Sequence, residues 1–195
     1  MASYAYGTQS SGETQMPLKV KILNPLATAP TIAHPGEDLG YDVYALRVQH
    51  QPVNPDGTPL PVNPPSPGLP YRIDTQGKTI HPIRVESGKP TLVKTGIAVH
   101  FDSPDGDSNR YGLLVRDRSS MALKGLFITA GVIDNGYRGE LGIVFNLTSG
   151  SYADIWPGDK IAQLIPIKVA ADTVEVVPEL TESERKEDGF GSTGQ

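Results

Sequence analysis

The stretch Val93-Lys94-Thr95-Gly96-Ile97-Ala98-Val99-His100-Phe101 decides the fold class. Within it, Val93, Thr95, Ile97, Val99 and Phe101 alternate with Lys94, Gly96, Ala98 and His100. This period of two is typical of a β-strand with one buried face. The stretch therefore predicts one strand and, with it, a sheet.

Similar short strands are expected on both sides, at residues 18–23, 41–48, 111–115, 126–128, 141–147, 161–169 and 174–177. Turn-forming sequences separate them: Pro104-Asp105-Gly106, Asn135-Gly136 and Pro157-Gly158-Asp159. One helical turn is expected at residues 120–124, with a serine capping its start and Gly125 ending it in a left-handed conformation. Many short strands and little helix predict an all-β sandwich or jelly roll rather than alternating strands and helices.

Size and charge restrict the classes of function. A chain of 195 residues suffices for one domain with a substantial core. The net charge of −5 gives no overall positive field, so we expect no nucleic acid as the main partner. Because the chain has no cysteine, catalysis must use oxygen or nitrogen groups. The sequence shows neither a membrane-spanning run nor an export signal, which predicts no membrane partner and a cytoplasmic location, or a nuclear one in a eukaryotic or viral source.

Three parts are expected along the chain. Residues 1–16 form a mobile N-terminal arm, residues 17–180 form the β domain, and residues 181–195 form a C-terminal arm. A proline-rich insertion interrupts the domain at about residues 49–71, where eight of the 18 prolines lie between Pro52 and Pro70. A stiff surface loop is favoured there over a peptide-binding proline motif.

The segment Val115-Arg116-Asp117-Arg118-Ser119-Ser120 leads from a strand into the helical turn. The guanidinium of Arg118 and the hydroxyls of Ser119 and Ser120 can donate to phosphate oxygens. The amides that open a helical turn also carry positive partial charge. A capped turn with Arg118 in a surface ion pair is the alternative interpretation.

Asp134 stands in a segment that could carry chemistry, because it directly follows an apolar run and precedes an Asn-Gly turn and Tyr137. An Asp in a tight turn often accepts hydrogen bonds from nearby backbone instead, and that is the alternative here.

The segment of residues 185–194 has a composition suited to gripping a ligand. Phe190 lies between glycines and can stack on a flat ring, while Arg185, Ser192 and Thr193 can bind an anion. A solvated chain end is the alternative.

Five segments resemble, in order, the five motifs of the trimeric dUTPase family: residues 36–45, 118–125, 131–140, 158–164 and 185–194. The likeness runs from about Leu18 to Gly194 and is interrupted by the insertion. It implies a distorted jelly roll (a β-clip), a homotrimer with shared active sites, and C-terminal arms exchanged between subunits. It also implies hydrolysis of dUTP to dUMP and pyrophosphate with Mg²⁺, which keeps uracil out of DNA and supplies dUMP for dTMP synthesis.

The resemblance also implies roles for single residues. Asp134 would deprotonate the water that attacks the α-phosphorus, and Asp42 would lie near Mg²⁺ through ordered water. The backbone of residues 128–133 would read the uracil edge, and Tyr137 would lie under the sugar and exclude a 2′-hydroxyl. The expected substrate-binding residues are Arg118, Ser119, Ser120, Gly131, Val132, Ile133, Tyr137, Gln163, Arg185, Phe190, Gly191, Ser192 and Thr193.

The C-terminal arm would act as a lid, with Phe190 over the base and Arg185 at the γ-phosphate. Two features depart from the family pattern. Lys186 and Asp188 stand where many members have glycine, and the family usually has a short connection in place of the proline-rich insertion.

Three other functions stay open at this point. A dCTP deaminase of the same fold would use Glu140 as a general acid or base, and would release ammonia from dCTP. A regulator would keep the nucleotide pocket without turnover. A jelly-roll coat or sugar-binding domain has no use for Asp134 or the lid.

Overall fold

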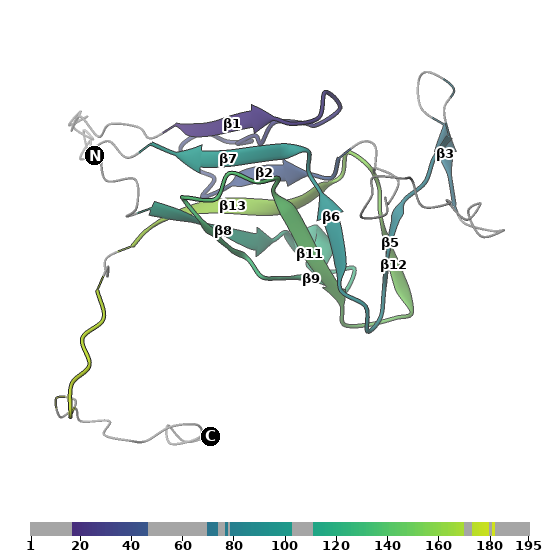
Figure 1. The fold of residues 1–195 in the computed structure, drawn as a ribbon. Helices are drawn as coiled ribbons and strands as arrows, with labels where there is room; N and C mark the ends of the chain where they lie inside the picture. Colours follow the sequence, from purple (N-terminus) through teal and green to yellow (C-terminus); the bar gives the residue numbers. More distant parts are fainter. Residues whose placement is uncertain are drawn as a thin grey trace, which may run out of the picture.

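The computed structural model describes residues 17–46, 70–73, 77, 79–102, 111–169, 173–179 and 181 (Figure 1). The expected N-terminal arm, nearly all of the proline-rich insertion and the Pro104-Asp105-Gly106 turn lie outside these residues. So do Arg185, Phe190, Gly191, Ser192 and Thr193 of the expected lid, together with Lys186 and Asp188.

The described residues form thirteen strands and one short helix. In chain order these are β1 (Leu18–Ile22), β2 (Tyr41–Tyr44), β3 (Arg72–Ile73), β4 (Thr79–Ile80), β5 (Ile83–Glu86), β6 (Thr91–Lys94), β7 (Ile97–Phe101), β8 (Tyr111–Asp117), α1 (Ser119–Ala122), β9 (Leu126–Thr129), β10 (Val132–Asp134), β11 (Gly142–Leu147), β12 (Tyr152–Ile155) and β13 (Lys160–Lys168). The all-β prediction is confirmed. Within the part of the chain that the structure describes, no helix is long and apolar enough to cross a membrane.

All strand pairs are antiparallel, and the largest sheet has the order β10-β8-β13-β2. A second sheet has the order β6-β11-β9, and three pairs are formed by β1-β7, β12-β5 and β3-β4. The sheets enclose one core, whose fully buried members include Phe101, Phe145 and Leu164. Tyr41 of β2 and Phe101 of β7 join two of the sheets, with ring centroids 6.4 Å apart.

The stretch that predicted a single strand forms two. β6 ends at Lys94 and β7 begins at Ile97, because Gly96 adopts φ +72° and turns the chain from one sheet into another. A Cβ at Gly96 would lie 2.7 Å from Leu46 Cδ1 and 2.9 Å from Ala27 Cβ, so the position also requires the absence of a side chain. The buried hydroxyl of Thr95 donates to the carbonyl of Leu141 at 2.5 Å.

Other expectations need correction at the element level. Residues 173–179 form no strand, and the side chains of Val174 and Val176 are 95% and 94% exposed, so they pack on nothing among the described residues. The strand expected at residues 41–48 ends at Tyr44. The strands β3, β4, β5, β10 and β12 were not predicted, since each has only two to four residues and too little alternation to detect.

The helical turn begins one residue earlier than expected. Arg118 is its N-cap and makes no side-chain capping bond, so the predicted serine cap is wrong. Gly125 has φ +78°, which confirms the predicted left-handed end.

Candidate active site

A buried carboxylate with two cationic partners marks one end of the largest sheet. Asp42 of β2 is only 5% exposed, and Lys160 Nζ lies 2.8 Å from its Oδ2. The guanidinium of Arg118 pairs with its Oδ1. Two cations face one carboxylate, so the cluster keeps one excess positive charge where a phosphate could be bound.

The backbone around Asp42 fixes this carboxylate. The backbone amide of Asp42 donates to the carbonyl of Thr31 at 2.7 Å, and the backbone carbonyl of Asp42 accepts from the Thr31 amide at 3.1 Å. On its other side Asp42 pairs with Gln163 of β13, which in turn pairs with Arg116 of β8. Asp42 and Gln163 therefore lie on one face of the sheet, as a common phosphate-binding role requires.

Lys160 belongs to the same cluster but was not predicted as a site residue. Lys160 lies three positions before Gln163, and an odd number of positions puts two side chains on opposite faces of a regular strand. A register shift between Lys160 and Ala162 changes this, so Lys160 pairs with Tyr44 and Gln163 with Asp42. Only the irregularity of β13 brings Lys160 to the carboxylate, and nothing in the sequence marks it.

Arg118, Ser119 and Ser120 open the helical turn beside this cluster. Arg118 Nε is buried and donates to no acceptor among the described residues. A buried donor without a partner costs free energy, so this nitrogen is suited to an acceptor that a ligand or a second copy supplies. Ser119 and Ser120 are exposed, and Met121 anchors the turn in the core.

Asp134 lies at a second location. It ends β10, pairs with Gly112 at the start of β8, and lines a pocket of about 290 Å³ with Tyr111 and Ile167. Its side chain is exposed and accepts no hydrogen bond from the rest of the described chain. The alternative, an Asp that serves only backbone bonds of its turn, is therefore wrong.

The next residue, Asn135, makes those backbone bonds instead. Its buried side chain accepts from the amide of Phe101 at 2.9 Å and donates to the carbonyl of Phe101 at 3.0 Å. The Tyr137 amide closes the turn on the carbonyl of Asp134 at 3.0 Å. Asn135 thus holds the turn on β7 and leaves the carboxylate of Asp134 free.

Tyr137 is a surface residue, 47% exposed, so it is not a plain core tyrosine. Its hydroxyl donates to the carbonyl of Glu140 at 3.0 Å. A Cβ at Gly139 would lie 2.5 Å from Tyr137 Cζ, so the glycine is required for this position of the ring.

Gly131, Val132 and Ile133 run beside β8. The carbonyl of Gly131 accepts from the Val115 amide at 2.7 Å, and a Cβ at Gly131 would lie 2.6 Å from the Val115 carbonyl oxygen. Ala130 before it has φ 56°, a left-handed conformation that is uncommon for a residue with a side chain. The segment is therefore a tight, closely fixed backbone edge.

Glu140 is already engaged elsewhere. Its Oε1 accepts from the Gly96 amide at 2.9 Å, and its Oε2 lies 3.1 Å from Lys94 Nζ. The carboxylate holds the break between β6 and β7, which disfavours the general acid or base role of a deaminase.

The two groups of residues lie far apart in one chain. Asp134 is level with Gly112, while Arg118 directly follows β8. Six residues of extended strand span roughly 20 Å. One chain therefore brings together Asp42, Lys160, Gln163 and Arg118, but not Asp134.

Comparisons with known proteins agree on one family. The dUTPase family model matches residues 79–194. The deoxyuridine 5'-triphosphate nucleotidohydrolase of Clostridium tetani is 31% identical over 185 residues, which cover 93% of this chain and 99% of that protein.

Two solved structures share the fold. The dUTPase of Staphylococcus bacteriophage 80alpha with dUPNHPP has a TM-score of 0.64 and 24% identity, and the match covers 92% of this chain and 99% of that one. A mutant dUTPase from phage phi11 of S. aureus, described as coordinating a structural Mg(II) ion, has a TM-score of 0.56 and 22% identity over 85% of this chain and 99% of that one. The predicted distorted jelly-roll fold is confirmed.

Proposed function

The chain belongs to the dUTPase family, and on this premise we propose that it hydrolyses dUTP to dUMP and pyrophosphate. The observation that carries the proposal is the pair of complementary groups at the two ends of β8. At one end, the cations Arg118 and Lys160 lie around the buried carboxylate of Asp42 and can bind phosphates. At the other end, the unpartnered carboxylate of Asp134 lies beside a pocket in the described part of the chain.

Since the two groups lie roughly 20 Å apart in one chain, a second copy must supply the missing half. As the family resemblance implies, we infer a homotrimer in which each active site is shared between subunits. The exposed Val174 and Val176 support an exchange of C-terminal arms, because a neighbouring copy would give them a surface to pack on.

Arg118, Ser119, Ser120 and Gln163 would hold the α and β phosphates. Arg118 has a free donor in its Nε, and Lys160 can keep Asp42 neutralised when the guanidinium turns to a phosphate. When Arg118 turns from Asp42 to a phosphate, Asp42 itself need not move far, because its backbone is hydrogen-bonded on both sides.

Asp134 would orient the attacking water and accept its proton. An exposed carboxylate without other hydrogen bonds has its lone pairs available for a water molecule. In-line attack on the α-phosphorus would then break the bond to the bridging oxygen, and pyrophosphate would leave with that oxygen.

The residues present fit a Mg²⁺ ion. Mg²⁺ at a nucleotide usually takes one or two carboxylates, waters and phosphate oxygens. Asp42 offers one buried carboxylate, and the described residues contain no group of three or more acidic or histidine ligands. When bound, Mg²⁺ would neutralise phosphate charge, and Asp42 would hold its water shell through hydrogen bonds.

The backbone of residues 128–133 would select uracil. The close contact between Gly131 and Val115 leaves this edge little freedom, so a thymine methyl group would clash rather than displace it. Tyr137, fixed by Gly139 and by the Glu140 carbonyl, would exclude the 2′-hydroxyl of UTP. The C-terminal arm with Arg185, Phe190, Gly191, Ser192 and Thr193 would cover the bound nucleotide.

A pyrophosphate-release assay that compares dUTP with dCTP, dTTP and UTP tests the proposal. We expect turnover with dUTP and Mg²⁺ and little with the others. Ammonia from dCTP would identify a deaminase, and tight dUTP binding without turnover would identify a regulator.

A further inference from the structure

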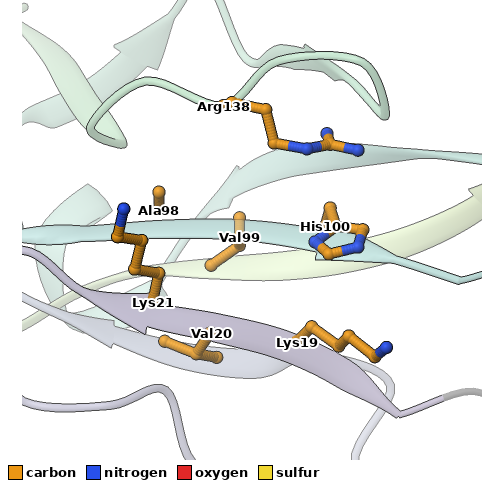
Figure 2. Close-up of a pocket in the computed structure, with 7 residues that line it drawn as sticks. All are labelled: Lys19, Val20, Lys21, Ala98, Val99, His100 and Arg138. Carbon is orange, nitrogen blue, oxygen red and sulfur yellow. The ribbon is translucent and has the colours of Figure 1, made fainter.

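A second pocket lies on the face of β1 and β7, beside the loop that carries Arg138. Lys19 pairs with His100 across the two strands, and Lys21 pairs with Ala98. Paired residues share one face of a sheet, and the small Ala98 leaves a hollow between its longer neighbours. Arg138, from the loop between β10 and β11, lines the hollow as well, and the resulting pocket has a volume of about 270 Å³ (Figure 2).

This pocket is cationic in a chain of net charge −5. It holds the side chains of Lys19, Lys21 and Arg138, and one carboxylate lies beside it, that of Asp102. Asp102 pairs with Lys19 and lies 3.0 Å from His100 Nε2. Three cations against one carboxylate leave two positive charges, on Lys21 and Arg138, without an acidic partner among the described residues.

Arg138 has part of its guanidinium left for a ligand. Its NH1 group donates to the carbonyl of Asn135 and, at 3.0 Å, to the carbonyl of Tyr137. A guanidinium has five N–H donors, so the edge formed by Nε and NH2 stays available for an anion that binds two donors at once. Lys21 lines the same pocket beside Ala98, while the guanidinium of Arg138 extends above His100 (Figure 2), so the long lysine side chain would supply a third donor from the other end.

We propose that Lys21 and Arg138, with Lys19 at the side, bind a small phosphate-class oxyanion. The donors suit phosphate oxygens, and no Phe, Tyr or Trp side chain of the described residues lines the pocket to stack on a base, which favours inorganic phosphate or pyrophosphate over a nucleotide. The two anions share this chemistry and differ in source, since pyrophosphate is the product of the proposed reaction.

An anion at this site would stabilise the turn of Asp134. Arg138 contacts the carbonyls on both sides of Gly136, and Asn135 ties the same turn to Phe101 at the end of β7. A ligand that fixes the guanidinium leaves the two NH1 bonds intact and restrains the turn. The site lies away from Arg118, so its binding function does not depend on the proposed hydrolysis.

The test is an NMR titration of the full-length protein without Mg²⁺, at constant ionic strength. One arm uses inorganic pyrophosphate and the other inorganic phosphate. We expect saturable shifts of the amides of Ala98, His100 and residues 135–138. Lys21→Gln should weaken the binding about tenfold, the effect of losing one charge-assisted hydrogen bond. Lys89→Gln, at another exposed lysine, should change it less than about twofold.

Tighter binding of pyrophosphate would identify the reaction product as the source, and equal or tighter binding of phosphate would identify free phosphate. Shifts confined to residues 118–121, or equal affinities of the wild type and Lys21→Gln, would overturn the proposal. The nucleotide assay separates this result from the proposed function, because Lys21→Gln should hydrolyse dUTP as the wild type does.

Discussion

Asp134 and Asn135 are neighbours with separate tasks. Asn135 is buried and makes two hydrogen bonds with the backbone of Phe101, whereas Asp134 is exposed and free of partners in the described chain. An Asp placed in a turn for its geometry would make the bonds that Asn135 makes. The free carboxylate is therefore the residue to test for chemistry.

Asp134→Asn should lower turnover of dUTP about 100-fold or more, because the amide keeps the size of the side chain but cannot accept the proton of water. Binding of a non-hydrolysable dUTP analogue should stay within about threefold of wild type. Steady-state kinetics and calorimetry measure the two effects. Glu86→Gln, at an exposed carboxylate paired with Lys89, is the matched control and should leave turnover unchanged. Near-normal turnover of Asp134→Asn would refute the assignment.

Asp38 adds a pH dependence at the residue scale. The amide of His34 donates to its carboxylate at 2.8 Å and holds the pKa of Asp38 below its usual value of 3.8. A lowered pKa means that the unfolded chain binds the proton more readily, so the stability from this bond is present at neutral pH and is lost as the pH falls below 3.8.

Asp38→Asn should therefore reduce the loss of unfolding free energy between about pH 6 and pH 3. Urea unfolding at a series of pH values measures that slope. A slope equal to that of the wild type would show that the hydrogen bond has no effect on stability.

At the element scale, the break between β6 and β7 shows what alternation in a sequence can predict. The positions that the alternation marks from Val93 to Phe101 are all buried, so the existence of β-structure was predictable, although Gly96 and Ala98 between them are buried as well. The change of sheet at Gly96 was not, because it depends on Leu46 and Ala27, which approach from a distant part of the chain.

Gly96→Ala tests this break. The left-handed φ costs about 1–2 kcal/mol for a residue with a side chain, and the contacts with Leu46 and Ala27 add to it. The free energy of unfolding should fall by roughly 2–4 kcal/mol. Gly88→Ala, where φ is +76° and no atom lies within 4 Å, should show the backbone cost alone. Equal losses in the two variants would contradict the role of crowding at Gly96.

The candidate site divides in the same way between predictable and unpredictable residues. Asp42, Arg118, Gln163 and Asp134 stand in motifs that local sequence reveals, and the structure groups the first three. Lys160 required the irregular register of β13. The strand expected at residues 174–177 is absent, and its valines at 174 and 176 have no partner surface among the residues that the structure describes.

The C-terminal arm is expected to matter for turnover and not for assembly. Deletion of residues 190–195 removes Phe190 and the residues expected to cover the phosphates, so hydrolysis should fall at least about tenfold. Size-exclusion chromatography should still show a trimer. A monomeric product would show that this segment holds the subunits together instead.

At the scale of the whole molecule, β8 sets the spacing of the chemistry. Its seven residues separate the cluster of Asp42, Lys160 and Arg118 from Asp134. Both groups can act on one nucleotide only if Asp134 of one copy faces Arg118 of another. The proposed division of the site between copies would thus be a consequence of strand length and register.

Mixing of two inactive variants measures this division most directly. Asp134→Asn and Arg118→Ala are each expected to be inactive, because each removes one half of every site. Unfolded together in equal amounts and refolded, they should regain about a quarter of wild-type activity, since a quarter of the subunit contacts in random trimers join two intact halves. Activity that stays at the level of the separate variants would contradict a site shared between copies.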